Sequence, residues 1–380
     1  MAVIKYLPEE IIDKTTNYLK IDKPKIIERK SLTNLRREYL NKAHKVLENK
    51  YGKNWARELT IRRDYKGIRL DDFPDYLFVY LQEDYRKRLF KVAYNVAGNL
   101  NKLATTLRVS PSRLSCWYEG KQKDYTKKVI ATQFTPLSKL KLISELLVKD
   151  NNHEFSMLNI ENNVIAYRMR AGNTIKNPKF PIQESPEMIR ILFHLLGDGY
   201  SGNKKNNANY KNTCPLLLEG FKKDLKIFGE VPIYEQQDSI KFPRLFAELI
   251  ENFYNVNTMT FESKISNEIL KLPKKLLYQG IKAFADDEGT IYQSSIRLCS
   301  ANYNLLNGIS KIIDLIKLKR GEIKKQHNER ATYGVTYYLD IKDIEAYHKH
   351  VGFSHPVKKK KLELFVKKKK SKLRRKELKS

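Results

Sequence analysis

Residues 187–202, EMIRILFHLLGDGYSG, and residues 276–291, LLYQGIKAFADDEGTI, decide the fold of this 380-residue chain. In each stretch, apolar residues recur at helical spacing and lead directly into acidic residues and a glycine. The apolar positions of the first stretch are Met188, Ile191, Leu192, Leu195 and Leu196. Those of the second stretch are Leu277, Ile281, Phe284 and Ala285. The pattern predicts two helices that each carry a carboxylate at the C-terminal end.

Each predicted helix is followed by the same order of elements: a strand pair, a helix, a second strand pair and a second helix. In the first copy these pieces are residues 200–212, 216–228, 231–236, 239–243 and 245–253. In the second copy they are residues 289–295, 296–300, 303–316, 321–326, 337–341 and 344–347. The sequence therefore predicts an α+β fold in which an αββαββα unit occurs twice with pseudo-twofold symmetry.

The doubled helix with its acid and glycine resembles the LAGLIDADG (DOD-type) homing endonucleases in their single-chain, two-motif form. Asp198 and Glu288 match the two motif acids, and residues 350–364, HVGFSHPVKKKKLEL, resemble the close of such a domain. The resemblance covers residues 184–366, with repeats at about 184–260 and 268–366. It implies that the two motif helices pack side by side and bring both acids to the centre of a DNA duplex that lies on two sheets.

The first motif departs from the family pattern in two respects. Leu192, Phe193 and His194 stand where the family packs small residues, which predicts a wider or shifted helix seam. Leu196 is neutral where the second motif has Asp286. We expect His194 to be an interior or interface histidine and not a ligand.

Two carboxylates at helix C-termini repel one another and also face the negative ends of the helix dipoles. They indicate a divalent cation, Mg²⁺ or another such as Mn²⁺, which can activate water and stabilise a leaving oxygen. The predicted metal ligands are Asp198, Glu288, Gly197 and Asp287. The predicted catalytic residues are Asp198, Glu288 and Lys271, the last because it resembles a basic position of the family. The alternatives are a helix cap or solvated charge for the acids and a surface lysine for Lys271.

The net charge of +30 indicates a polyanionic partner, because Lys and Arg that neutralise phosphates release counterions. Residues 358–380 hold 13 Lys and Arg and two Glu, which gives this segment a net charge of +11. The other 357 residues therefore still carry +19, so the rest of the chain is basic as well. The predicted double-stranded DNA contacts on the strands are Lys204, Lys205, Asn207, Tyr210, Lys211, Gln236, Lys241, Gln293, Arg297, Lys324, Gln326 and Arg330. For each residue, the alternative is the polar face of a half-exposed sheet.

Residues 100–120, LNKLATTLRVSPSRLSCWYEG, resemble a helix-turn-helix. Ser110 and Pro111 open its second helix, which would present Ser112 and Arg113 to a major groove. Two helices and a turn are also common in any helical domain.

The sequence divides into five predicted domains or segments. These are a helical region 1–95 of unknown role, including a periodic stretch after Pro74, the helix-turn-helix 96–125, a connector 126–183 with a helix at 137–147, the endonuclease-like domain 184–366 and a basic tail 367–380.

Three cysteines without pairing or metal-ligand spacing are typical of a reducing compartment, and we expect a cytoplasmic protein. No apolar run approaches membrane-spanning length, so no membrane partner is expected. The doubled motif predicts a monomer with internal pseudo-dimer symmetry.

The function predicted from these features is a site-specific, metal-dependent endonuclease that hydrolyses double-stranded DNA. One alternative is a regulator that keeps the fold and binds DNA without cutting it. Another is an RNA-splicing maturase whose partner is intron RNA. An intein is not expected, because the chain starts at Met1 and ends in a lysine-rich tail, without a splicing-type Cys or Ser start or His-Asn end.

Overall fold

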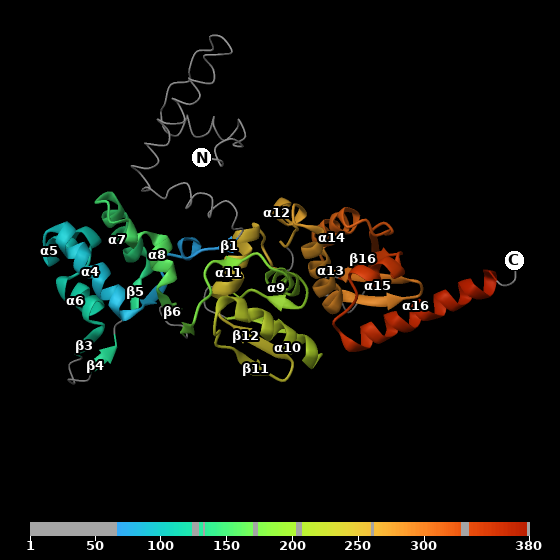
Figure 1. The fold of residues 1–380 in the computed structure, drawn as a ribbon. Helices are drawn as coiled ribbons and strands as arrows, with labels where there is room; N and C mark the ends of the chain where they lie inside the picture. The colour runs from blue at the N-terminus through green and yellow to red at the C-terminus, as the bar shows by residue number, and fades with distance from the viewer. Residues whose placement is uncertain are drawn as a thin grey trace, which may run out of the picture. The chain divides into compact units, whose positions relative to one another are not determined.

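The computed structural model describes residues 67–123, 129–131, 134–169, 174–202, 207–259, 262–327 and 334–377 (Figure 1). The predicted helices of residues 1–66 lie outside this range. The chain forms two compact units, one of residues 1–65 and 144–156 and the other of residues 66–143 and 157–380. The described residues of the first unit form the second half of α7 (Leu137–Lys149) and the short η3 (His153–Phe155). Helices and antiparallel sheets make up the described structure, so the predicted α+β class is confirmed.

The second unit begins with an antiparallel sheet of order β5-β2-β6-β7. Its strands are Phe134–Pro136 (β5), Phe78–Leu81 (β2), Val164–Arg168 (β6) and Ile175–Lys176 (β7). Two further strand pairs join β1 (Gly67–Ile68) to β8 (Ile182–Gln183), and β3 (Lys121–Lys123) to β4 (Val129–Ala131). The helices among these strands include η2 (Leu70–Asp72), α4 (Glu83–Ala97), the first half of α7, and α8 (Met157–Asn162).

The helix predicted to follow Pro74 is wrong over its first turns, because Phe78–Leu81 is strand β2 and α4 begins only at Glu83. Val79 and Leu81 are buried while Phe78 and Tyr80 are half-buried, which is the two-residue period of a strand. The predicted connector contains the expected helix, since α7 starts at Leu137, but it also supplies three strands of the sheet. Strand β2 is therefore joined to β5 and β6 by pairing across the predicted boundaries at 95 and 125.

The two helices predicted within residues 100–120 are α5 (Leu100–Leu107) and α6 (Pro111–Glu119). Ser110 accepts a hydrogen bond from the Arg113 backbone N–H at 3.2 Å, so the predicted cap of α6 is confirmed. Ser112 and Arg113 are exposed, as predicted, whereas Leu114 and Trp117 of the same helix are buried. These facts establish the helix pair and leave its DNA-binding role as a prediction.

The second half of the chain contains two four-stranded antiparallel sheets. The elements around the first are α9 (Pro186–Leu196), β9 (Gly199–Tyr200), β10 (Ala208–Lys211), α10 (Pro215–Asp224), η4 (Leu225–Phe228), β11 (Tyr234–Gln236), β12 (Ser239–Phe242) and α11 (Arg244–Tyr254). The elements around the second are α12 (Asn267–Leu270), α13 (Lys274–Glu288), β13 (Gly289–Tyr292), β14 (Ser295–Ser300), α14 (Tyr303–Leu315), β15 (Lys324–His327), β16 (Val335–Ile341), α15 (Ile344–His350) and α16 (Pro356–Glu377).

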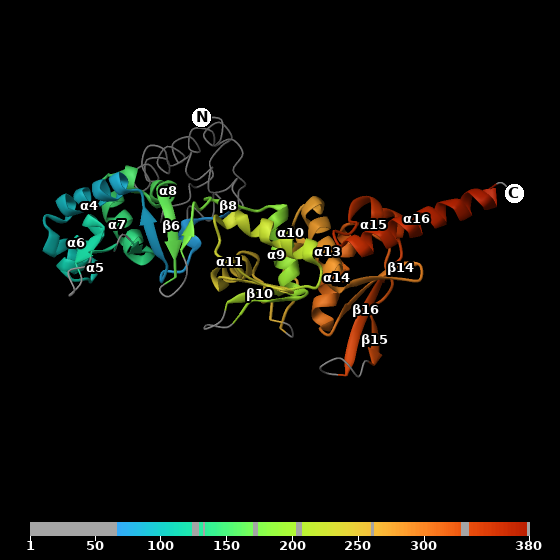
Figure 2. The same ribbon diagram turned by 90° about the horizontal axis from the view of Figure 1, so that it is seen from below.

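The strand orders of the two sheets are β11-β12-β10-β9 and β13-β14-β16-β15. In both sheets, the second and fourth strands along the chain are central and the first and third are at the edges. Helices α9 and α13 pack along one another, and both views show them as neighbours (Figures 1 and 2). The predicted basic tail is not separate from the preceding helix, because α16 runs from Pro356 through Glu377.

The seam between α9 and α13 pairs a large side chain with a glycine. A Cβ atom built on Gly280 would lie 2.7 Å from the ring of Phe193, which is closer than packed atoms come. The bulky first motif is thus accommodated because the second motif has no side chain at the contact. Met188, Ile189, Ile191, Leu192, Phe193, His194, Leu195 and Leu196 are all buried, so α9 is a core helix.

We expect Gly280→Ala to lower the free energy of unfolding by about 1–3 kcal/mol, because the added methyl group overpacks the contact with Phe193. The measurement is urea denaturation. Gly220→Ala in α10 is the matched control, since nothing lies within 4 Å of the methyl group that it adds. This control should gain up to about 1 kcal/mol from the helix propensity of alanine. If both substitutions raised the free energy of unfolding by the same amount, the tight contact between Phe193 and Gly280 would be contradicted.

Candidate functional site

Asp198 and Glu288 lie at corresponding ends of the paired helices. Glu288 is the last residue of α13, and Asp198 follows α9 after Gly197. Glycine follows each acid and begins a strand, where a Cβ atom would clash with the preceding helical turn. On Gly289 it would lie 2.5 Å from the Ala285 carbonyl oxygen, and on Gly199 it would meet the Leu195 backbone. The glycines are therefore required by close backbone approach, and each acid is held where a helix turns into a strand.

The surroundings of the two acids disfavour their charged forms. Partial burial, and then the charge of Asp287, raise the pKa of Asp198 to about 6, although Asp198 is exposed at the surface. Burial, and then the charges of Asp198 and Asp287, raise the pKa of half-buried Glu288 to about 8. Glu288 therefore lies near enough to Asp198 to be influenced by its charge. A cation bound between these carboxylates would relieve both effects.

Asp287 is the centre of a buried polar cluster formed with His194, Tyr210 and Asn212, which we call the Asp287 cluster. Its carboxylate contacts His194 Nδ1 at 2.8 Å and accepts hydrogen bonds from the Tyr210 hydroxyl at 2.8 Å and Asn212 Nδ2 at 3.2 Å. Asn212 Nδ2 also lies 3.1 Å from Asp198 Oδ2. Asp287 of the second motif thus binds side chains of α9, β10 and the residue that follows β10. Asn212 links Asp287 to Asp198 of the first motif.

The composition of the Asp287 cluster favours a charged histidine. Burial alone lowers the pKa of His194, but the charge of Asp287 and the hydrogen bond to it outweigh this effect, so the pKa is raised. The exposed side-chain fractions are 5% for His194 and 0% for Asp287, so solvent screens this ion pair little. His194 is interior, in agreement with the sequence, but its partner was not predicted.

Lys358 brings a cation to the same end of α13. Its Nζ donates to the carbonyl oxygens of Ala285 at 3.1 Å, Asp286 at 2.5 Å and Asp287 at 3.2 Å. Burial lowers the pKa of Lys358, whereas the neighbouring acids, including Asp198 and Glu288, raise it, and burial prevails. The sequence places Lys358 in a run of four lysines, and no feature of that run distinguishes it from its neighbours.

Asp286 fixes the start of helix α16, which carries Lys358. Its buried carboxylate accepts backbone hydrogen bonds from Ser354 at 2.8 and 3.0 Å and from His355 at 2.9 Å. A carboxylate at a helix N-terminus is favoured by the helix dipole. The three consecutive acids of the second motif thus have different surroundings: Asp286 and Asp287 are held by hydrogen bonds, whereas Glu288 is influenced by the charges of Asp198 and Asp287.

The donor set fits a divalent cation only in part. Among the described residues, no group of three or more His, Cys, Asp or Glu side chains forms a ready metal centre. Mg²⁺, however, often binds one or two carboxylates and completes its shell with water and substrate phosphate oxygens. Asp198 and Glu288 suit that arrangement. The carboxylate of Asp287 already contacts His194, Tyr210 and Asn212, and these contacts would compete with a metal ion. The metal-binding roles of Asp287 and Gly197 stay predictions.

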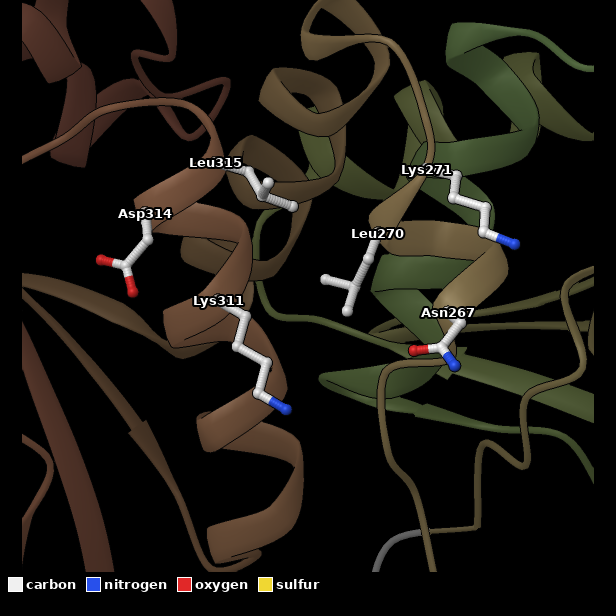
Figure 3. A pocket seen from close by; sticks show the side chains of 6 residues that line it. All are labelled: Asn267, Leu270, Lys271, Lys311, Asp314 and Leu315. Atoms are coloured by element: carbon white, nitrogen blue, oxygen red, sulfur yellow. The ribbon is translucent and has the colours of Figure 1, made fainter.

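Lys271 is not brought to the acids. It lies between α12 and the start of α13, and Glu288 ends that helix, roughly 21 Å away at 1.5 Å per residue. Lys271 instead lines a pocket of about 530 Å³ between α12 and α14 (Figure 3). Its other lining residues are Asn267, Leu270, Lys311, Asp314 and Leu315. Among the described residues, Lys358 is a lysine that does contact the end of α13, and the sequence did not identify it.

Helices cover one face of the second sheet, because α13 and α14 pack on β14 and α14 packs on β16. Side-chain alternation places Arg297, Lys324 and Gln326 on the other, open face, while exposed Gln293 lies in the β13–β14 turn. In the first sheet, Lys211, Gln236 and Lys241 share the open face, and Asn207 is exposed before β10. Their contact with DNA stays a prediction.

Tyr210 is a correction to the predicted DNA contacts. It is fully buried and faces the helices, where its ring stacks on Phe221 and its hydroxyl binds Asp287. Its position between two polar neighbours on β10 gave the opposite expectation. Lys204, Lys205 and Arg330 lie outside the described residues.

Comparison with known proteins gives distant likenesses. No family model matches the chain. The replication factor C small subunit of Methanocaldococcus jannaschii is 21% identical over an alignment of length 261, which covers 64% of this chain but only 14% of that protein. The chain therefore spans about one seventh of the length of this relative.

Solved structures similar to the chain include the homing endonuclease I-DmoI in complex with DNA and Ca, at a TM-score of 0.32, 12% identity, and coverage of 47% of this chain and 97% of that one. The homing endonuclease I-WcaI bound to its DNA recognition sequence gives a TM-score of 0.29, 13% identity, and coverage of 44% and 81%. Full-length DUF199/WhiA from Thermatoga maritima gives 0.30, 12%, and coverage of 49% and 61%. At these scores the likeness assigns no activity to the chain. In the part of the chain that the structure describes, no helix is long and apolar enough to cross a membrane.

Proposed function

We propose that this chain is a site-specific, divalent-metal-dependent DNA endonuclease of the LAGLIDADG homing type, with residues 184–366 forming a pseudo-twofold pair of αββαββα repeats. The observation that carries the proposal is the pairing of Asp198 and Glu288 at matched ends of two packed helices, with pKa values raised to about 6 and about 8. Acids in such surroundings are poor structural choices unless a cation joins them.

The surroundings of the acids also suit a phosphodiester substrate. The two sheets that follow the acids present basic and amide side chains on their open faces, among them Lys211, Lys241 and Lys324. Lys and Arg bind phosphates, and amides read base edges, so a duplex along these faces would place its backbone over the acids. The exposed face of α6, with Ser112 and Arg113, would extend the recognised site.

The contacts of the residues support a role for each of them in the proposed reaction. A divalent cation held by Asp198 and Glu288 would supply activated water and stabilise the leaving oxygen. Asn212 orients Asp198 through its 3.1 Å hydrogen bond and is itself held by Asp287. Lys358 places positive charge beside both acids, where a phosphate would gather negative charge in the transition state.

The raised pKa values predict a pH effect on stability. Since the folded protein binds protons at Glu288 and Asp198 more tightly than the unfolded chain does, stability falls as pH rises from about 4.5 through about 8. In EDTA, we expect the melting temperature to fall between pH 6 and pH 8, and added Mg²⁺ to raise it more at pH 8. Glu288→Gln should reduce both effects. An equal Mg²⁺ response at both pH values in the unaltered chain would contradict the prediction.

The test of the proposed function is cleavage of a random-site duplex library by the full chain in Mg²⁺, in Mn²⁺ and in EDTA. Sequencing of the cut ends should yield one recurring site that is cut only with a divalent cation. Glu288→Gln protein prepared in parallel excludes a contaminating nuclease. Enrichment of one bound site without strand breaks would instead identify the non-cleaving regulator.

The alternative of a regulator has one observation in its favour. The ammonium group of Lys358 already neutralises the end of α13 near the acids, which lessens the need for a metal there. Binding that is insensitive to divalent cations would favour this function. Preferential competition by intron RNA over duplex DNA would favour the maturase.

A further inference from the structure

Arg297 is fixed on the open face of the second sheet by an ion pair and two aromatic rings. Its Nε donates to Asp340 Oδ1 at 2.8 Å and its Nη2 donates to Oδ2 at 3.0 Å. The two residues are direct partners in the pairing of β14 with β16. The guanidinium carbon lies 3.8 Å from the ring centroid of Tyr292 and 4.0 Å from that of Tyr338. We call these four residues the Arg297 cluster.

The contacts leave one edge of the guanidinium group for a ligand. Asp340 takes the edge formed by Nε and Nη2, so the fork formed by Nη1 and Nη2 keeps its outward hydrogens. The rings come from β13 and β16, which flank β14 on opposite sides. Only 17% of the Arg297 side chain is exposed. A ligand must therefore meet Arg297 edge-on, in a fixed plane.

We propose that Arg297 reads a single guanine in the DNA target, with Asp340 as its positioning residue; this inference rests on the proposed function. Guanine offers two major-groove acceptors, O6 and N7, that match the fork. Adenine and cytosine place amino donors there, and thymine offers one acceptor beside a methyl group.

The ion pair also explains why a base is favoured over a phosphate. The carboxylate of Asp340 neutralises Arg297 and would repel a phosphate at the same position, whereas a guanine edge is uncharged. Because Asp340 and the rings already hold the side chain, little rotamer entropy remains to be lost on binding. A free lysine such as Lys324, which is exposed on the same sheet, suits a phosphate better.

The register of the sheet places this guanine near the centre of the site. Thr290 pairs with Arg297 and lies two residues after Glu288. Two strand residues span about 7 Å, or roughly two base-pair steps. The guanine should therefore lie about two base pairs from the phosphate that Glu288 faces.

The experiment is selection of bound duplexes from a random library in EDTA, so that the readout does not require cleavage. The full-length chain is compared with Arg297→Lys, Arg297→Ala and Asp340→Asn. Arg320→Lys is the matched control, because Arg320 makes a similar bidentate contact with Asp314, which belongs to α14 on the covered face. Thermal melting of each variant establishes that it is folded.

We expect the unaltered chain and Arg320→Lys to select the same site with one central guanine. Arg297→Lys and Arg297→Ala should lower the preference for guanine at that position about 5- to 150-fold. The base preferences at the other positions of the site should not change. Asp340→Asn should weaken the preference and steepen the salt dependence of nonspecific binding, because a freed arginine seeks phosphate.

Two results would overturn the inference. If the Arg297 variants select the unaltered site at every position, Arg297 is not a specificity residue, and the proposed function is untouched. If the unaltered chain selects no sequence at all, site-specific DNA binding fails and this inference fails with it.

Discussion

Glu288→Gln will reduce strand cleavage at least about a hundredfold while the chain still binds its site. Loss of one carboxylate from a metal pair removes several kcal/mol of transition-state stabilisation, and each 1.4 kcal/mol corresponds to a factor of ten in rate. The substitution keeps the size of the side chain and removes a charge that the protein disfavours, since burial and two neighbouring acids raise the pKa of Glu288 to about 8. The measurement is single-turnover conversion of supercoiled plasmid in saturating Mg²⁺.

Asp198→Asn should have the same effect, because under the proposed function the two acids hold one cation together. Glu219→Gln on α10, where Glu219 is half-exposed and pairs with Lys222, is the matched control and should cleave at the rate of the unaltered chain. Binding affinity is measured in EDTA for all variants and should differ little. Cleavage retained by the double variant Asp198→Asn with Glu288→Gln would rule out the proposed endonuclease function.

The elements around the acids could be predicted because their patterns are local. The helical period of residues 188–196 and 277–285 and the glycines after the acids gave α9 and α13, and short alternating runs gave the strands. Phe78–Leu81 shows where this fails, since four apolar residues fit a helix or a strand equally well. Pairing with β5 and β6, which lie more than fifty residues later, decides that segment.

The surroundings of the acids could not be predicted, because they depend on contacts between distant parts of the chain. Lys358 reaches the end of α13 only because Asp286 anchors the start of α16 about seventy residues away. The sequence places Tyr210 among the strand side chains suited to contact DNA, yet its ring is in the core. The same polar pattern fits either assignment until the register of β10 is known.

Asp287→Ala will lower the free energy of unfolding by about 3–5 kcal/mol, because it leaves a buried imidazolium without its counter-ion. It also removes the acceptor for Tyr210 and Asn212, which lie 2.8 and 3.2 Å from the carboxylate. The measurement is denaturation in urea at pH 6. Asp314→Ala is the control, since Asp314 is 53% exposed and its ion pair with Arg320 should contribute at most about 1 kcal/mol.

The size of the Asp287→Ala effect should depend on pH in a way that an ordinary core contact does not. The pKa of His194 is raised, so the stabilisation from its charge is complete below the unfolded value of about 6.5 and is lost as pH rises through the folded value. The loss of free energy of unfolding caused by Asp287→Ala should therefore be smaller at pH 9 than at pH 6. It should also shrink in the double variant His194→Phe with Asp287→Leu, which removes both buried charges together. A destabilisation that is the same at both pH values would mean that His194 is neutral and that Asp287 holds His194, Tyr210 and Asn212 by hydrogen bonds alone.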